Sequence, residues 1–334
     1  MTDRLPDTGP STSPSAYSPD FLLELYRTIY TIRLFEHRGI ELYRAGLIRG
    51  YFHTYLGEEA VAAGVCAALD RRDYIVSTHR GHGHCIARGA DIRRMVAEIL
   101  GKETGYCKGL GGSMHIADTA GGNLGANGIV GGGIAMGVGA ALGASIRGED
   151  RVCAIFFSDG ASNNGVFAES LNLAAVWNAP AVFVLENNHY AVCTPIEKSC
   201  RADHLYRIGE GFGVQSSMID GNDVLEVFEA TQEAVGLCRT MQGPVLIEAK
   251  TFRYGGHHVN DPGNYVPRER LEYFKAKDPL KVARGHALAV GGIDHERIAG
   301  VEREVEHAMD EAVAFAKDSR ELSPERFFQM MEDY

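Results

Sequence analysis

The sequence lacks the features that mark nucleic-acid-binding, disulfide-bonded or thiolate-metal proteins. Its 334 residues carry a formal net charge of −11, whereas a nucleic-acid-binding surface is usually basic. The seven cysteines are odd in number and form no CxxC pair, so they do not suggest a disulfide framework. We therefore expect no nucleic-acid partner and a reducing, cytoplasmic location.

Long runs of large apolar residues are also missing. The single uncharged stretch of membrane-spanning length, residues 128–146, consists mostly of glycine and alanine, which drive insertion weakly. Residues 1–20 contain four prolines together with Ser, Thr and Asp, and no apolar segment typical of a signal peptide. We predict no membrane association, and a disordered leader over residues 1–20.

Short apolar strands alternate with helical patterns in the centre of the chain, which predicts an α/β fold: a parallel sheet with helices on both faces. Residues 21–266 form the expected domain, and the charged residues 267–334 form its C-terminal helical tail. Strands are predicted at 74–76, 152–157, 181–185 and 245–251, and helices at 21–44 (with Asp20 as N-cap), 57–69, 91–100, 165–177 and 224–238. The glycine-rich segment 101–133 is predicted to be a functional loop.

Polar residues follow two of these strands where each one ends. Asp159 and Gly160 follow the second predicted strand, and Asn188 follows the third. Ligands bind beyond the carboxyl ends of parallel strands. A carboxylate, an amide oxygen and a backbone carbonyl near Tyr190 suit Mg²⁺ that holds a diphosphate, and Gly160 lets the backbone approach the phosphates. The alternative is two ordinary turns, because Asp-Gly and Asn-Asn are common turn pairs.

Several segments of the chain match one family in register. They are Ser158-Asp159-Gly160 with Glu186-Asn187-Asn188, and residues 49–53, 108–115 and 252–257. These motifs resemble the α subunit of the thiamine-diphosphate-dependent first component of 2-oxo acid and acetoin dehydrogenase complexes, and residues 79–87 are most similar to acetoin dehydrogenase α subunits. The resemblance implies a thiamine-diphosphate-binding fold.

The resemblance also implies roles for individual residues. Mg²⁺ would be held by Asp159, Asn188 and the Tyr190 carbonyl. The diphosphate would meet the amides of Gly160 and Ala161 and pair with Arg80. The aminopyrimidine ring would meet the backbone of Gly128 and Val130. The implied active-site histidines are His53 and His257, and His257 would contact phosphate or the reacting group. Three positions depart from the family pattern, namely Ser158, His79 and His258.

By the same resemblance, the chain cleaves acetoin or decarboxylates a 2-oxo acid, and passes the product unit to a lipoyl-bearing acyltransferase component. The essential glutamate would come from a β subunit, so two α chains would pair with two β chains. Acetoin, pyruvate and branched-chain 2-oxo acids remain open as the small carbonyl substrate. The glycine-rich run 131–143 would be a close-packed helix, either at a subunit contact or within the domain.

Two other classes of function remain as alternatives. One is a zinc hydrolase that uses His79, His82, His84, His257 and Asp159, since zinc favours His and carboxylate ligands; no HExxH motif supports it. The other is a non-catalytic scaffold subunit.

Overall fold

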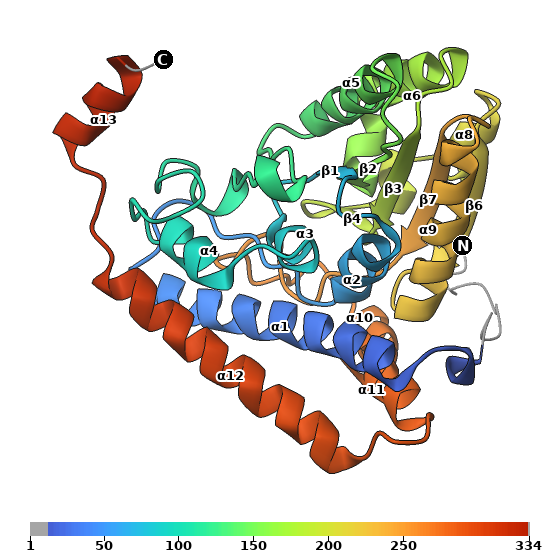
Figure 1. The fold of residues 1–334 in the computed structure, drawn as a ribbon. Helices are drawn as coiled ribbons and strands as arrows, with labels where there is room; N and C mark the ends of the chain where they lie inside the picture. The colour runs from blue at the N-terminus through green and yellow to red at the C-terminus, as the bar shows by residue number, and fades with distance from the viewer. Residues whose placement is uncertain (1–12, 333–334) are drawn as a thin grey trace.

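The computed structural model describes residues 13–332, and its centre is a five-stranded parallel sheet (Figure 1). The strand order is β1-β2-β3-β7-β6. The strands are β1 (Tyr74–Val76), β2 (Cys153–Ser158), β3 (Ala181–Asn187), β6 (Gln215–Asp220) and β7 (Val245–Lys250). A short antiparallel pair, β4 (Tyr190–Ala191) and β5 (Thr194–Pro195), lies outside the sheet. The predicted α/β fold class is therefore confirmed.

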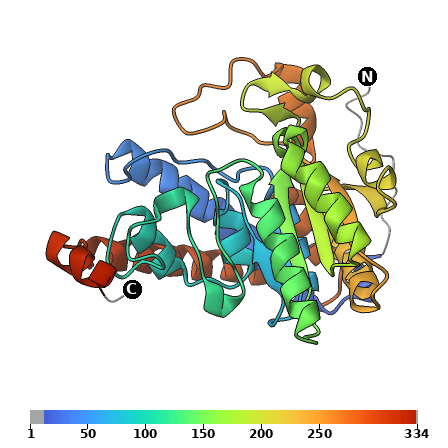
Figure 2. The ribbon, with the colours of Figure 1, turned by 90° about the horizontal axis from the view of Figure 1, so that it is seen from above.

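Alternating side chains of the central strands enter two separate cores, which is why these strands are apolar throughout. Ile155 and Phe157 of β2 belong to the core under α5 (Gly132–Ile146) and α6 (Gly165–Val176). Ala154 and Phe156 belong to the core on the other face, under α2 (Glu59–Ala68) and α9 (Val224–Arg239). Figure 2 shows α5 and α6 side by side along one face of the sheet.

A second layer of helices lies beside the sheet. In Figure 1 the long α12 (His295–Asp318) runs along α1 (Pro19–Arg44), and it also packs on α4 (Ile92–Ile99). The predicted C-terminal tail is therefore helical and packed for most of its length. The other helices of the tail are α10 (Arg268–Ala276), α11 (Pro279–Leu288) and α13 (Pro324–Glu332). Short helices elsewhere in the chain are α3 (His82–Ala87), α7 (Ile196–Ser199) and α8 (Arg207–Glu210). The 3-10 turns are η1 (Pro14–Ala16), η2 (Gly112–Met114), η3 (Thr119–Gly121) and η4 (Asp159–Asn163).

The start of α1 differs from the prediction. Ser18, not Asp20, is the N-cap, because its side chain accepts a hydrogen bond from the Phe21 amide and Pro19 suits the first helical position. Most of the predicted disordered leader lies outside the described residues. Its described part, residues 13–20, contains a 3-10 turn, and Tyr17 donates a 2.6 Å hydrogen bond to Glu229. Within residues 13–332, no helix combines the length and apolarity that a bilayer crossing requires.

The glycine-rich loop is organised around a buried carboxylate that the sequence did not single out. Glu98, at the end of α4, is fully buried. Its two oxygens accept hydrogen bonds of 2.7–3.1 Å from the amides of Cys107, Gly109, Gly111 and Gly112. Four charge-assisted bonds satisfy the carboxylate, so Glu98 has a structural role in ordering this loop.

Helix α5 carries glycines on two faces with different surroundings. A Cβ at Gly137 would lie 2.4 Å from Ile155 Cγ1, and one at Gly133 would lie 2.8 Å from Val76 Cγ1. These two glycines let α5 pack closely on β1 and β2. A Cβ at Gly139 would meet nothing within 4 Å, and one at Gly143 only the end of the Arg147 side chain. The helix is thus close-packed within the domain on one face and open on the other.

This asymmetry predicts opposite effects of two alanine substitutions. Gly137→Ala should lower the free energy of unfolding by about 1–3 kcal/mol, because its Cβ overlaps Ile155. Gly139→Ala should raise it by about 0.5–1 kcal/mol, because alanine favours a helix interior and has room there. Urea unfolding of the full chain measures both. Equal destabilisation by the two substitutions would contradict this account of α5.

Candidate functional site

A cavity of about 160 Å³ lies at the carboxyl ends of the central strands. It is bounded by segments that are far apart in the sequence. Residues at or just after the ends of β1, β2, β3 and β7 meet Glu58, the residue before α2, there. The lining residues include Glu58, Thr78, His79, Arg80, Val130, Ser158, Gly160, Glu186, Asn188, Tyr190, Val192, Arg253 and His257. Six of the predicted site residues, Arg80, Val130, Gly160, Asn188, Tyr190 and His257, are therefore brought together.

Asp159 carries a buried carboxylate that forms no ion pair with the protein's own side chains among the described residues. It begins the turn η4 directly after β2, between the lining residues Ser158 and Gly160, and its side chain is fully buried. Neither of its side-chain oxygens has a partner with good hydrogen-bond geometry among the described residues. Burial raises the pKa of this carboxyl to about 7, although the positive charge of Arg253 and the nearby backbone N–H groups of Asn188 and Gly160 oppose the shift. An unsatisfied buried carboxylate is costly for a fold, so its retention indicates a ligand.

Asn188 lies beside Asp159 and is held in a fixed orientation. Its side-chain oxygen accepts a 3.3 Å hydrogen bond from the Tyr190 amide, and its side-chain nitrogen donates to Glu58 Oε1 at 3.0 Å. The segment that contains Tyr190, β4, packs against η4. A Cβ at Gly160 would come within 2.9 Å of the Ala191 Cβ, so only glycine permits this approach. The three predicted metal ligands thus come from two adjoining turns.

Two buried guanidinium groups give the cavity positive charge. Arg80 and Arg253 are each 4% exposed. Arg80 donates to the carbonyl oxygens of Thr54 and His257, and its Nε lies 3.6 Å from Glu58 Oε2. Arg253 donates 2.8 Å hydrogen bonds to the Val192 carbonyl and the Tyr265 hydroxyl. Burial and the nearby Arg253 lower the pKa of Arg80 to about 10. A bound anion would therefore offset the unfavourable burial and mutual repulsion of the two positive charges.

The predicted contacts with an aminopyrimidine ring are less simply arranged. The Gly128 amide donates a 3.3 Å hydrogen bond to His115 Nε2, and the Val130 carbonyl accepts one of 3.1 Å from Asn164. Val130 lines the cavity described above, and it also lines a narrow neighbouring cavity of about 20 Å³ together with Ala161. Gly128 lines neither. For the Gly128 backbone to meet the aminopyrimidine ring, its amide would have to give up the hydrogen bond to His115.

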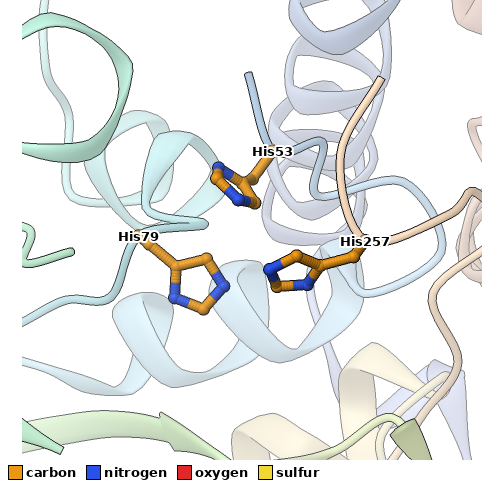
Figure 3. Close-up of side chains that lie close together, drawn as sticks. All are labelled: His53, His79 and His257. Atoms are coloured by element: carbon orange, nitrogen blue, oxygen red, sulfur yellow. The ribbon is translucent and has the colours of Figure 1, made fainter. Parts of the chain in front are cut away.

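Three histidines converge at the edge of the cavity (Figure 3). His53 precedes α2, His79 follows β1 and His257 follows β7. The ring centroids lie 4.8 Å apart for His53 and His257, 4.9 Å for His53 and His79, and 5.5 Å for His79 and His257. Burial is the main cause that lowers all three pKa values, with Arg80 adding to the effect, to about 3 for His79 and about 4 for His257. All three imidazoles are thus neutral near pH 7.

The other histidines of the same motif have structural partners. His82 contacts Glu36 Oε1 and the Ser113 hydroxyl, both at 2.9 Å. His84 contacts the Ser77 hydroxyl at 2.8 Å and Glu186 Oε1 at 3.0 Å. Both side chains are fully buried. The hypothetical zinc set of His79, His82, His84, His257 and Asp159 is therefore not assembled, since both rings use their two nitrogens to hold α3 in the core.

Sequence reasoning missed Glu58 and gave no role to Arg253, although both residues shape the cavity. Glu58 joins Asn188 to Arg80, and Arg253 adds the second buried positive charge. The sequence carries a signal for each. Glu58 is a charged residue immediately before an apolar, alanine-rich helix, and Arg253 lies in the same post-strand segment as His257. His79 was noted as a departure from the family pattern and as a member of the alternative zinc set, and its ring proves to be part of the histidine cluster.

A larger cavity, of about 720 Å³, lies elsewhere, between the glycine-rich loop and α13. Its walls include Glu98, whose oxygens are already satisfied, and the aromatic residues Phe327 and Phe328. It contains none of the predicted site residues. The smaller cavity is the better candidate because the unpartnered polar groups adjoin it.

The donor set around the smaller cavity fits Mg²⁺ and a diphosphate. Mg²⁺ prefers oxygen ligands and commonly takes one or two carboxylates plus phosphate oxygens, and the bare oxygens of Asp159 supply the carboxylate. Two buried arginines beside it suit phosphate, since guanidinium groups bind phosphate oxygens well. The assignment of individual ligands remains a prediction.

Comparison with known proteins identifies the family. The family model described as "Dehydrogenase E1 component" matches residues 27–325. The chain belongs to this family. It is a thiamine-diphosphate-dependent oxidoreductase of the α-subunit type, and the family predicted from its motifs is confirmed.

Relatives of known activity agree with this assignment. The chain is 46% identical over 298 residues to the α subunit of acetoin:2,6-dichlorophenolindophenol oxidoreductase of Bacillus subtilis, covering 89% of each chain. It is 44% identical over 305 residues to the corresponding subunit of Cupriavidus necator, covering 91% of this chain and 92% of that one. The pyruvate dehydrogenase E1 component α subunit of Zymomonas mobilis is 39% identical over 308 residues, with 91% and 87% covered.

Proposed function

We propose that this chain is the α subunit of an acetoin dehydrogenase that depends on thiamine diphosphate and Mg²⁺. The observation that carries the proposal is the buried, unpartnered carboxylate of Asp159, set beside Asn188 and two buried arginines. Acetoin is favoured as substrate because the two acetoin-oxidising relatives are 46% and 44% identical, against 39% for the pyruvate dehydrogenase relative. Pyruvate and branched-chain 2-oxo acids are the second candidates.

The chain's own residues would bind and orient the cofactor. Asp159, Asn188 and the Tyr190 carbonyl would hold Mg²⁺, while Arg80, Arg253 and the amides of Gly160 and Ala161 would hold the diphosphate. When bound, thiamine diphosphate supplies the nucleophilic carbon that cleaves a bond next to a carbonyl group. Glu58 fixes the orientation of Asn188 and Arg80 in advance, so less side-chain ordering would accompany binding.

The neutral imidazoles of His53 and His257 would contact the substrate. The Nδ1 atoms of both rings are buried and have no hydrogen-bond partner among the described residues. A neutral imidazole donates from one nitrogen and accepts at the other. At neutral pH these rings can therefore donate a hydrogen bond to a substrate carbonyl or accept one from a substrate hydroxyl.

A β subunit would complete the site, in an assembly of two α and two β chains. The supporting observation is a set of exposed large apolar side chains at the ends of α5 and α6, namely Ile129 at 73%, Ile146 at 77%, Val176 at 67% and Trp177 at 52% exposure. Exposed apolar surface can mark an interaction site, and α5 also has room beside Gly139 and Gly143. The proposal extends to a lipoyl-bearing acyltransferase as the acceptor of the product unit.

All seven cysteines, every one within the described residues, are free thiols, which supports a reducing cytoplasmic location.

Co-expression with the partner β subunit tests the proposal. We expect dye reduction to be fastest with acetoin, slower with pyruvate and branched-chain 2-oxo acids, and to require β chain, thiamine diphosphate and Mg²⁺ together. Replacement of the dye by a lipoyl-bearing component tests the acceptor. Stoichiometric zinc together with activity independent of thiamine diphosphate would favour a hydrolase instead. A β-bound complex that binds no thiamine diphosphate would favour a scaffold subunit.

A further inference from the structure

The histidine cluster has the composition and geometry of a transition-metal site. His53, His79 and His257 each offer a ring nitrogen, and these three atoms all lie within 4.8 Å of one another. Figure 3 shows the three rings facing a common space from three separate segments. The unpartnered, buried Nδ1 atoms of His53 and His257 are a second, independent indication of a missing ligand.

We propose that His53, His79 and His257 form a binding site for a divalent transition-metal ion such as Zn²⁺, and that an ion bound there excludes the carbonyl substrate. This site is distinct from the Asp159 site, whose oxygen ligands suit Mg²⁺. Imidazole nitrogen favours Zn²⁺, Co²⁺, Ni²⁺ and Cu²⁺ over Mg²⁺. The exclusion of substrate rests on the proposed function, whereas the binding of metal does not.

The geometry requires only a small rearrangement of side chains. A tetrahedral zinc ion with Zn–N bonds of about 2.0–2.1 Å places its nitrogen ligands about 3.3 Å apart. The three nitrogens therefore need to move inward from their spread of up to 4.8 Å. Hydrogen bonds at Nδ1 do not hold the rings of His53 and His257 in place. Three protein ligands leave a fourth position open for water.

The protonation state of the cluster suits metal binding, but the surrounding charge limits its strength. Metal ligation requires neutral imidazole, and burial together with Arg80 lowers the pKa of each ring. The charged and titratable groups around the rings are Arg80 and Arg253, with Asp261 and the imidazole of His258 beside His257. The two arginines repel a cation, so we expect binding that is weaker than at a structural zinc site and is reversed by a chelator.

His258 stays outside the three-histidine set. Its ring centroid is 6.1 Å from that of His53 and 6.2 Å from that of His257. Its Nδ1 accepts a 3.2 Å hydrogen bond from the Asn260 amide. Among the three proposed ligands, His79 is the most informative one to replace, because His53 and His257 are also predicted to contact substrate.

Titration of the untagged, chelator-treated complex of α and β chains with Co²⁺ and Zn²⁺, in the absence of thiamine diphosphate and substrate, tests the site. We expect one ion per α chain, a visible Co²⁺ spectrum typical of four-coordinate nitrogen ligation, and displacement of Co²⁺ by Zn²⁺. His79→Asn should weaken the affinity for Zn²⁺ by at least about tenfold. The matched control is His307→Asn, which changes a histidine that is 76% exposed on α12, and it should leave the affinity unchanged.

Further variants and an inhibition assay complete the test. If His79→Asn does not fold, as judged by circular dichroism, His257→Asn takes its place with the same expectation. Asp159→Asn should still bind Zn²⁺, because the two sites share no ligand. In active complex, Zn²⁺ should inhibit in competition with acetoin. Equal Zn²⁺ affinity of wild type and a folded ligand variant, or the absence of a one-to-one complex, would overturn the metal site. Binding with no effect on turnover would overturn the exclusion of substrate.

Discussion

Asp159→Asn is expected to abolish retention of Mg²⁺ and thiamine diphosphate while the fold is preserved. Asparagine has nearly the same shape but lacks the negative charge that would balance the metal. Changes to residues that merely support metal ligands already cost about 10–100-fold in affinity, so loss of this carboxylate should cost more than about 100-fold. Cofactor that remains bound after gel filtration, measured by thiochrome fluorescence, reports the result.

Thermal stability gives a second readout for the same substitution. In the wild type, saturating cofactor should raise the free energy of unfolding by about 2.7 kcal/mol at 100 times its dissociation constant. Without cofactor, the variant should be as stable as the wild type or more stable, because a buried carboxylate without partners has been removed. Asp294→Asn, at the exposed N-cap of α12, is the control and should behave as wild type. Normal cofactor retention by Asp159→Asn would remove this residue from the metal site.

Arg80→Gln should give the second largest loss. Truncating one partner of a buried, hydrogen-bonded charge pair costs about 2–5 kcal/mol, or roughly 30- to 5000-fold in affinity. Arg80 is buried and lines the cavity that is predicted to hold the diphosphate. Titration calorimetry of thiamine diphosphate with Mg²⁺ present, on the complex of α and β chains, measures the change.

Two related variants separate charge from shape. Arg80→Lys keeps the charge but not the planar fork, so its loss of affinity should be intermediate. Arg93→Gln, on the exposed surface of α4, should bind cofactor normally. Unchanged binding by a folded Arg80→Gln would show that Arg80 holds only the carbonyls of Thr54 and His257.

The sheet was predictable from sequence because four of its strands are apolar on both faces. Strand β1 was placed at its observed bounds, and the others to within a few residues. Strand β6 was missed because Gln215, Ser216 and Ser217 make it polar. It pairs only with β7, at the edge of the sheet, so most of its side chains stay partly exposed. Edge strands need not be apolar, and periodicity alone cannot find them.

The turn-forming residues after β2 and β3 were also predictable, since parallel strands bring their carboxyl ends together. The spacing of residues alone does not predict the histidine cluster, because it depends on three segments separated by more than twenty residues each. The motif resemblance named two of its members, His53 and His257, as active-site histidines. The alternative zinc set was wrong. His79, His82 and His84 are close in the chain, yet α3 turns the last two into the core, where Glu36 and Glu186 bind them.

Glu58 connects the two halves of the candidate cofactor site. One of its oxygens accepts a hydrogen bond from Asn188, on the metal side, and the other lies 3.6 Å from Arg80, on the phosphate side. A ligand that shifts either partner changes the restraint on the other, which is the physical basis of a coupling free energy. Metal and diphosphate should therefore bind cooperatively, each raising the affinity for the other by the same factor. The total binding free energy of metal and diphosphate would then be the same whichever of the two binds first.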